Sequence, residues 1–450
     1  MTTRAVEILS RLALQIRTPN VARHYRQAQQ RQWWSHEQLL DDQKAKLLAL
    51  LQHCKADVPY YQQRLSDLSP ENMVADALQT LNEAPLLTKE LLRQEQQQLK
   101  AKTTHVQRSK EIASGGSTGN PVRFLMDLDL FDQVEAHLRL VFSWAGWKPG
   151  EMVLHFWGDN HASLTVGGWK AFRAKLAGRA IIPVCDYDER DFEQWWRMSQ
   201  HYRPTIIYGY PSVIANYAAW LIEKGRRTQK VKGVFTTAEM LLPQHRKLME
   251  TAFSCKVFNQ YGSREAPGIA CECEQGNIHL FIDNNVVEFI PETQDSAALS
   301  RIVVTPLHKY AQPLLRYELG DLGTATTEEC SCGRHYPLME RLTGRERDHL
   351  IATDGRRIYP GFFTRLMDDK RWVRAFQFNQ NSPVQIELLL ETVESEQIEP
   401  LLQQISAELA PKITEKMGSK VRLNVRSVER IARTPLGKFR YVANRIQDEP

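Results

Sequence analysis

The stretch Ser114-Gly115-Gly116-Ser117-Thr118-Gly119-Asn120-Pro121 sets the pattern for this chain. Its first six residues hold three glycines and three hydroxyl side chains, which favour neither a helix nor a strand because glycine leaves the backbone free. A run of free N–H and O–H donors suits the oxygens of a phosphate chain. No Lys-Ser or Lys-Thr follows the glycines, so this is not the common ATPase loop. On its own, the stretch fits a phosphate-binding loop and a plain surface loop equally well.

Length and composition indicate an ordinary globular protein. With 450 residues, of which 42% are hydrophobic and 25% charged, we expect two or three domains. No apolar run approaches the ~18 residues of a transmembrane helix, and the N-terminus lacks the features of a signal peptide. Seven cysteines, an odd number with several clustered, argue against a disulfide scaffold. The sequence therefore predicts a cytoplasmic protein without a transmembrane segment.

The net charge of +5 is concentrated at the C-terminus. Residues 411–450 hold ten Lys and Arg against four Asp and Glu, which leaves 48 basic and 49 acidic residues elsewhere. Such a basic tail binds nucleic acid or lipid headgroups, or closes over a polyanionic substrate. Nucleic acid is disfavoured because Phe439 and Tyr441 are the only aromatic residues in this tail.

The N-terminal segment 1–62 is predicted to be helical. Residues 1–32 form an amphipathic, basic pattern interrupted at Pro19, for which packing on the main body is favoured over a weak peripheral membrane contact. Ser35 followed by Gln38 predicts the capped start of a second helix. The Val58-Pro59 step should end it.

Short apolar runs alternate with helical segments after the glycine-rich stretch. The expected strands are Met152–Trp157, Ala180–Val184, Thr205–Gly209, Gly233–Thr237 and Cys255–Tyr261. The expected helices lie near 127–145, 163–177, 188–201, 211–226 and 241–253. This alternation predicts an α/β domain with a mostly parallel sheet. Residues 286–305 are strand-like without helices, which indicates a small β-rich subdomain.

Residues 345–450 are predicted to form a separate α+β unit. Strands are expected near 374–380, 384–391 and 421–428, and a helix near 395–409. The composition changes at Arg341–Asp348, where Gly344 predicts a hinge. We therefore expect a large domain over 1–344 and a small, mobile C-terminal domain over 345–450.

Four polar side chains in turns and loops could act on a nucleotide. Glu265 follows an expected parallel strand, at the edge where such sheets bind ligands, and suits Mg²⁺. Asp321, between two glycines, could accept hydrogen bonds from ribose hydroxyls or simply bond its own turn. Arg345 could reach a ribose or a phosphate. Lys438, on a Pro/Gly loop, either delivers positive charge to a reacting phosphate or is merely solvated.

Two Cys-x-Cys pairs and a histidine predict a metal site. Cys271, Cys273, His279, Cys330 and Cys332 have the spacing of a tetrahedral zinc site. The favoured ligands are Cys273, His279, Cys330 and Cys332, a Cys₄ set with Cys271 is the alternative, and buried inert thiols are the third interpretation. Four protein ligands leave no open position, so the zinc would be structural.

The motif order SGGSTGNP, YGSRE, YELGDLG, RLTGRERD and TPLGK, over 325 residues from Ser114 to Lys438, resembles the adenylate-forming superfamily of acyl-CoA synthetases and luciferases. Within it the chain is most similar to the phenylacetate-CoA ligase and coenzyme F390 synthetase branch, which includes CapK-like proteins of polysaccharide biosynthesis. The segments Trp33–Tyr61 and Tyr208–Ser212 resemble that branch too, and some of its members share the favoured zinc set.

The resemblance implies an ATP-dependent ligase. A carboxylate would attack the α-phosphate of Mg·ATP to give an acyl-adenylate and pyrophosphate, and an acceptor would then take the acyl group. The implied ATP and AMP contacts are Ser114, Gly115, Gly116, Ser117, Thr118, Gly119, Ala238, Glu239, Tyr261, Gly262, Ser263, Asp321 and Arg345. Glu265 would hold magnesium, and Lys438 would stabilise charge with Arg345. Tyr208, Gly209 and Tyr210 would contact the carboxylate substrate.

The acceptor is expected to be coenzyme A. One alternative is an enzyme without CoA that acylates an amine, such as an amino sugar, or transfers AMP. Another is a non-catalytic, zinc-stabilised binding protein. Arg264 departs from the family pattern, which has threonine there, so a phosphate-contacting hydroxyl is missing or replaced. A homodimer is the default assembly for such an enzyme.

Overall fold

The computed structural model describes most of the chain. The described residues are 19–67, 70–103, 105–114, 122–158, 174–185, 187–291, 299–345, 348–368, 370, 372–392, 398–434 and 436–446. The loop residues Gly115, Gly116, Ser117, Thr118 and Gly119 therefore lie outside the described residues. So do residues 1–18 and most of the helix expected at 163–177.

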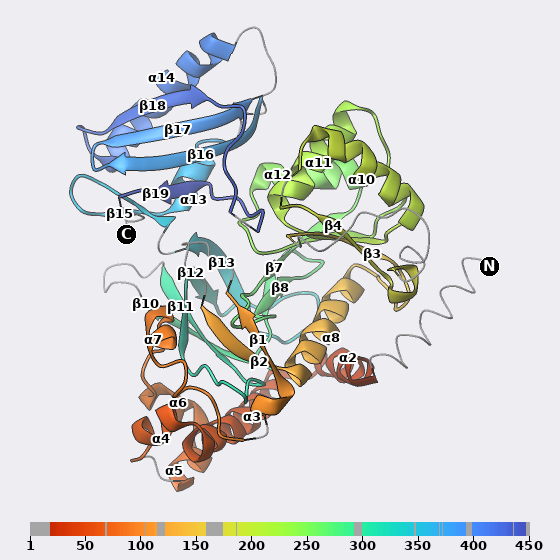
Figure 1. The fold of residues 1–450 in the computed structure, drawn as a ribbon, viewed down its shortest axis with the longest axis vertical. Coiled ribbons are helices and arrows are strands. Elements are labelled where there is room, and N and C mark those ends of the chain that lie inside the picture. Colours follow the sequence, from red (N-terminus) through yellow and green to blue (C-terminus); the bar gives the residue numbers. More distant parts are fainter. Residues whose placement is uncertain are drawn as a thin grey trace.

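Eleven of the described strands pair into one large sheet in the order β10-β11-β12-β13-β9-β8-β7-β6-β5-β3-β4 (Figure 1). One half is parallel and confirms the expected α/β pattern; it comprises β3 (Val153–Trp157), β4 (Arg179–Pro183), β5 (Ile206–Gly209), β6 (Gly233–Thr236) and β7 (Lys256–Tyr261). The other half is antiparallel and comprises β8 (Ala270–Glu272), β9 (Ile278–Leu280), β10 (Asn285–Pro291), β11 (Ser300–Pro306), β12 (Tyr317–Thr326) and β13 (Leu338–Arg345). The expected β-rich subdomain is thus continuous with the parallel strands.

Helices cover both faces of the parallel strands because alternate side chains point to opposite faces. Ile206 packs into a core with α8 (Leu128–Trp144), whereas Ile207 packs into a second core with the other helices. These helices are α10 (Glu189–Tyr202), α11 (Pro211–Glu223) and α12 (Pro243–Phe253). The nearly continuous apolar runs of these strands follow from burial on both faces.

The N-terminal helices are α2 (Pro19–Arg31), α3 (His36–Asp57), α4 (Pro59–Arg64), α5 (Pro70–Ala75), α6 (Ala77–Glu83) and α7 (Lys89–Gln94). Of these, α3 to α6 pack at the opposite end of the molecule from the C-terminal unit (Figure 1), whereas the start of α7 lines a cavity beside that unit. The capping box of Ser35 with Gln38 is confirmed, and α3 ends before Pro59 as expected. A short 3-10 helix (Val106–Arg108) then leads into the hairpin of β1 (Ser109–Ala113) and β2 (Arg123–Asp127), which flanks the glycine-rich stretch.

The C-terminal unit is a four-stranded sheet with its own core. Its strands pair in the order β18-β17-β16-β19. Their bounds are Val373–Ser382 (β16), Gln385–Thr392 (β17), Arg422–Ser427 (β18) and Val442–Asn444 (β19). Two short strands, β14 (Leu350–Ile351) and β15 (Arg357–Ile358), and the helix α13 (Pro360–Arg365) precede the sheet. The division at 344 and 345 stays a prediction, with Gly344 at a positive φ of 110°.

The helix α14 (Ile398–Met417) runs further than the sequence predicted. Pro411 lies inside it, and proline removes a helical hydrogen bond. The apolar spacing nevertheless continues past it, since Leu409, Ile413 and Met417 are all buried. Packing of this face outweighs the local cost of the proline. Among the helices of the described ranges, none has the length and apolarity needed to span a bilayer.

Candidate active site

A cavity of about 370 Å³ lies between the large sheet and the C-terminal unit. The segments that line it include the ends of β7, β12 and β13, the loop before β19, and residues 88–90 and 238–241. The expected site residues at its wall are Ser114, Ala238, Glu239, Tyr261, Gly262, Ser263, Glu265, Asp321, Arg345 and Lys438. The fold therefore gathers these side chains and turns, which are far apart in sequence, around one space.

Asp321 is placed by strand pairing and not by the turn that the sequence suggested. It lies within β12, directly opposite Arg345 of β13. Gly320 before it has a φ of 72°, and bulges interrupt the ladder nearby, which explains why a glycine-rich sequence fits a strand here. The Tyr261 hydroxyl donates to Asp321 Oδ2 at 2.9 Å, and Arg345 Nε lies 3.9 Å from Oδ1.

The Asp321 carboxylate retains acceptor capacity after these contacts. Burial raises its pKa, and the charge of Arg345 opposes this rise. A carboxylate offers about four lone-pair positions, of which Tyr261 uses one. The group is therefore suited to accept hydrogen bonds from vicinal hydroxyls in the cavity.

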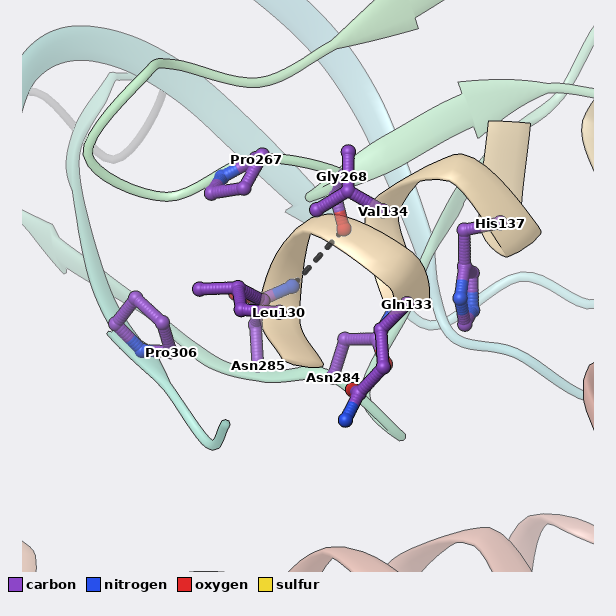
Figure 2. Close-up of a pocket in the computed structure, with 9 residues that line it drawn as sticks. All are labelled: Leu130, Gln133, Val134, His137, Pro267, Gly268, Asn284, Asn285 and Pro306. Carbon is purple, nitrogen blue, oxygen red and sulfur yellow. Dashed lines mark hydrogen bonds between the residues drawn. The ribbon is translucent and has the colours of Figure 1, made fainter. Parts of the chain in front are cut away.

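Glu265 lies in a tight turn after β7. Ser263 N donates to Ala266 O and Ala266 N donates to Ser263 Oγ, both at 3.0 Å. Figure 2 shows how the far end of the turn is held, with Asn285 Nδ2 donating to Gly268 O at 3.0 Å. The pocket drawn there is about 10 Å³, room for about one water. The turn is thus fixed while Glu265 lines the main cavity, where an oxygen ligand suits Mg²⁺.

Lys309, which sequence reasoning missed, lies behind this turn. Its side chain is fully buried, with Nζ 3.4 Å from Glu265 O and 4.1 Å from the centre of the Phe124 ring in β2. Burial lowers the pKa of Lys309 to about 7, against the opposing charges of Glu265 and Asp127. Lys309 therefore connects the Glu265 turn to the β1–β2 hairpin. A single lysine between His308 and Tyr310 gives no sequence signal for this.

The base of the glycine-rich stretch is closed by Ser114. Its N–H donates to Val122 O at 2.7 Å, and its Oγ accepts from Val122 N at 2.8 Å. Arg264 Nη1 donates to Ala113 O at 2.9 Å. The guanidinium that stands in place of the family threonine thus contacts the end of β1, beside the loop's first residue.

Lys438 enters the cavity from the C-terminal unit. Thr434 N donates to Lys438 O at 2.9 Å, and Lys438 N donates to Thr434 Oγ1 at 3.0 Å, which fixes the loop. Burial lowers the pKa of Lys438 to about 8, and Arg345 adds to this effect. The ammonium is thus a desolvated positive charge facing the same space as Glu265 and Asp321.

Tyr208, Gly209 and Tyr210 are packed behind the cavity and are not among its lining residues. The Tyr208 ring stacks on Trp157 at 5.7 Å, and the Tyr210 ring lies 5.1 Å from the same indole. Burial raises the pKa of Tyr208 far above its usual value. The structure therefore does not place these three residues with the nucleotide residues, and their contact with an acyl group stays a prediction.

Three cysteines and a histidine cluster at the β8–β9 hairpin. The ligand atoms of Cys273, His279, Cys330 and Cys332 all lie within 4.8 Å of one another. His279 Nδ1 faces Tyr336 O at 3.3 Å, which leaves Nε2, 3.3 Å from Cys332 Sγ, to face the cluster. Cys271 is outside this group, with its thiol directed at Glu272 O. The donor set fits a tetrahedral zinc ion and favours the His279 set over the Cys₄ alternative.

The C-terminal unit is recognised by a family model. Residues 350–445 match the model described as CapK C-terminal domain. Most of this unit is therefore similar to the C-terminal domain of CapK. The unit supplies Lys438 to the cavity, and Arg430 and Phe439 of the same loop bond Tyr187 and Glu239 of the large domain.

Similarity also extends beyond the C-terminal unit. The chain is 28% identical to phenylacetate-coenzyme A ligase of Thermus thermophilus over 338 residues, covering 72% of this chain and 74% of that protein. It is 22% identical to Protein CapK of Staphylococcus aureus over 371 residues, covering 82% and 81%. The expected relationship to these two groups is thereby confirmed.

Solved structures show the same fold. A 2-hydroxyisobutyryl-CoA ligase in its postadenylation state superposes with a TM-score of 0.70 at 21% identity, covering 90% of both chains. The same ligase in its thioesterification state gives a TM-score of 0.56 at 20% identity, covering 89% of this chain and 88% of that one. The expected fold, a large α/β part followed by a small α+β part, is confirmed.

Glu239, whose expected nucleotide contact stays a prediction, also makes hydrogen bonds within the protein. Its Oε1 accepts from Phe439 N of the C-terminal unit at 2.6 Å, and its Oε2 accepts from Ser212 N of α11 at 3.2 Å. Burial raises the pKa of this carboxyl. The side chain thus connects two parts of the protein, although Ala238 and Glu239 both line the cavity.

Proposed function

We propose that this protein is an ATP-dependent ligase that converts a carboxylate to an acyl-adenylate and passes the acyl group to coenzyme A. The observation that carries the proposal is the single cavity in which Glu265, Asp321, Arg345 and Lys438 meet. An acidic pair of side chains for magnesium and ribose, with two cations for phosphates, suits a nucleoside triphosphate. The similarity to phenylacetate-coenzyme A ligase supports the same assignment.

The first step needs no general base, because a carboxylic acid is already ionised at neutral pH. A carboxylate oxygen attacks the α-phosphorus of ATP, and the bond from that phosphorus to the bridging oxygen of pyrophosphate breaks. Lys438 and Arg345 offset the negative charge that builds up on the phosphate oxygens. Asp321 holds the ribose, and Glu265 is the residue that would hold magnesium, which neutralises phosphate charge when bound.

In the second step the acceptor thiol attacks the acyl carbon. The bond from that carbon to the AMP oxygen breaks, AMP leaves, and the thiol proton passes to solvent. Each step exchanges one bond for another, so neither needs a redox partner. The glycine-rich stretch would hold the β- and γ-phosphates, which leave as pyrophosphate in the first step.

The test is ATP–pyrophosphate exchange over a panel of aliphatic, aromatic and hydroxy acids. We expect exchange with at least one acid, and Lys438→Ala should lower the rate about 10²–10³-fold. Lys412→Ala is the matched control, since Lys412 is an exposed lysine of the same domain paired with Glu408. Absence of exchange with every acid, or equal loss in both variants, would contradict the proposal.

The acceptor is identified by product mass with CoA or amines added. Transfer to an amine, such as an amino sugar, or of AMP itself is the alternative, which the similarity to the C-terminal domain of CapK keeps open. A thioester product supports CoA, and an amide product or an AMP adduct supports the alternative.

We also propose that Cys273, His279, Cys330 and Cys332 hold a structural zinc ion. The site would tie the β8–β9 hairpin to the loop between β12 and β13. Protein purified without added metal should contain about one equivalent of zinc. Cys330→Ser should lose it, whereas Cys255→Ser, which changes a cysteine outside the cluster, should retain it. A zinc content below a few tenths of an equivalent in the unmodified protein contradicts the proposal.

A further inference from the structure

The loop of the C-terminal domain that carries Lys438 meets the large sheet through two glycines. Gly158 follows β3, and a Cβ added there would lie 2.2 Å from Leu436 O. Gly437 has a φ of 77°, and a Cβ added there would lie 2.4 Å from Val184 O, just after β4. Real Cβ atoms do not approach an oxygen so closely. The two backbones therefore fit together only because both positions lack a side chain.

Hydrogen bonds surround this backbone contact. Arg433 Nη1 donates to Ser212 Oγ at 3.1 Å and to Gly437 O at 3.3 Å. Arg430 Nη2 donates to Tyr187 O at 3.0 Å. The loop is thus held at the carboxyl ends of the parallel strands by the polar contacts of Arg430 and Arg433, which precede Gly437 in the chain.

Among the described residues at this junction, Glu239 is the one acidic side chain that accepts hydrogen bonds from backbone N–H groups of both the large domain and the C-terminal domain. Phe439, whose N–H donates to Glu239, is the residue next to Lys438. Ser212, whose N–H donates to the other oxygen, is the second residue of α11, and its hydroxyl also accepts from Arg433. Both oxygens of the Glu239 carboxylate thus accept a hydrogen bond. Loss of this side chain would leave the N–H groups of Ser212 and Phe439 without their acceptor.

We propose that Glu239 is a positioning residue that fixes Lys438 in the cavity for the adenylation step, and that the Gly158–Leu436 contact sets the seat of the loop. The inference rests on the proposed function and gives Glu239 a role at the loop besides its expected nucleotide contact. A misplacement of about 1 Å at a reacting centre can cost ~10²-fold in rate. A bond to the amide beside Lys438 is placed to prevent such a shift.

Gly158→Ala tests the close contact between Gly158 and Leu436 without altering any proposed contact to ATP. We expect kcat of ATP–pyrophosphate exchange to fall about 100-fold, with KM for ATP changed less than about threefold. Gly361→Ala is the matched control, because a Cβ at that glycine of the same domain meets nothing within 4 Å. Glu239→Gln, which keeps the shape but can accept only one of the two bonds, should lose about 10-fold in kcat.

Hydrogen exchange separates positioning from a general loss of structure. The Phe439 amide should exchange at least 10-fold faster in Gly158→Ala and Glu239→Gln, while amides of β16 and β17 keep wild-type rates. The inference is overturned if kcat falls in these variants while hydrogen exchange of the Phe439 amide is unchanged. It is also overturned if Gly158→Ala keeps the wild-type kcat. If the wild-type protein exchanges pyrophosphate with no acid, the proposed function fails. Hydrogen exchange of the Phe439 amide then still decides whether Glu239 and Gly158 hold the loop in place.

Discussion

The lowered pKa of Lys438 makes the pH dependence of adenylation a direct prediction. Burial and Arg345 lower this pKa to about 8 in the free protein. The lysine acts as a cation, so activity should be present below this pH and lost as pH rises through it. About 90% of the protein carries the charge at pH 7 and about 10% at pH 9, for a pKa of 8.

The profile of kcat/KM reports the free enzyme. Above pH 8 we therefore expect kcat/KM for ATP–pyrophosphate exchange to fall about tenfold per pH unit. In the profile of kcat the fall should move to higher pH, because the charge of bound ATP favours the protonated lysine. Replacement of Arg345 by alanine should also raise the pKa of Lys438, because the positive charge of Arg345 contributes to lowering it.

The assay is initial-rate exchange from pH 6.5 to 10 at constant ionic strength, on wild type and Lys438→Arg. Arginine stays charged over this range, so the variant should lack the fall above pH 8 even if its rate is lower throughout. A wild-type profile that stays flat to pH 9.5 would refute the reasoning. So would an identical fall in both proteins, since the titrating group would then not be Lys438.

Three further predictions concern nucleotide binding and stability. Lys309 has a pKa of about 7 in the folded state, against 10.5 for a solvated lysine. The unfolded state therefore binds more protons between these two pH values, and the free-energy cost of burying this lysine shrinks as pH rises. The stability of Lys309→Met relative to wild type, from urea unfolding, should therefore decline by on the order of 3 kcal/mol from pH 6.5 to 9.5, whereas Lys420→Met, which changes an exposed lysine, should show no such trend. Asp321→Asn should weaken ATP binding about 10–100-fold by calorimetry through loss of charge-assisted hydrogen bonds, and an unchanged affinity, as expected for exposed Asp354→Asn, would contradict the ribose assignment. Ser35→Ala should cost about 1 kcal/mol in unfolding free energy, because it removes the cap of α3, and a cost near zero would contradict that contribution.

The α/β architecture could be predicted because its causes are local. Strands buried on both faces give continuous apolar runs, and the helices between them carry apolar faces and caps that can be recognised one by one. Ser35 with Gln38 is an example, because both partners of the cap lie within four residues. The cluster of Cys273, His279, Cys330 and Cys332 was also predictable as a set, since Cys-x-Cys pairs limit the choices.

The remaining features depend on contacts between distant segments. His279 was separable from Cys271 only in three dimensions, where the Cys271 thiol turns away from the cluster. Lys309 acquires its role from Phe124 and Glu265, which lie on two other segments. The motif position of Glu239 predicts a nucleotide contact, but not that its carboxylate also accepts a hydrogen bond from an amide 200 residues away. Local patterns carry no information on such pairings.

The central claim is tested most directly by following the oxygen atoms of the substrate acid. If a carboxylate oxygen attacks the α-phosphorus, an acid labelled with ¹⁸O in both carboxyl positions must leave one label in AMP after acyl transfer. Mass spectrometry of the released nucleotide should then show AMP heavier by one ¹⁸O, with unlabelled pyrophosphate. Unlabelled AMP, or ADP with labelled phosphate, would contradict an acyl-adenylate and with it the proposed function.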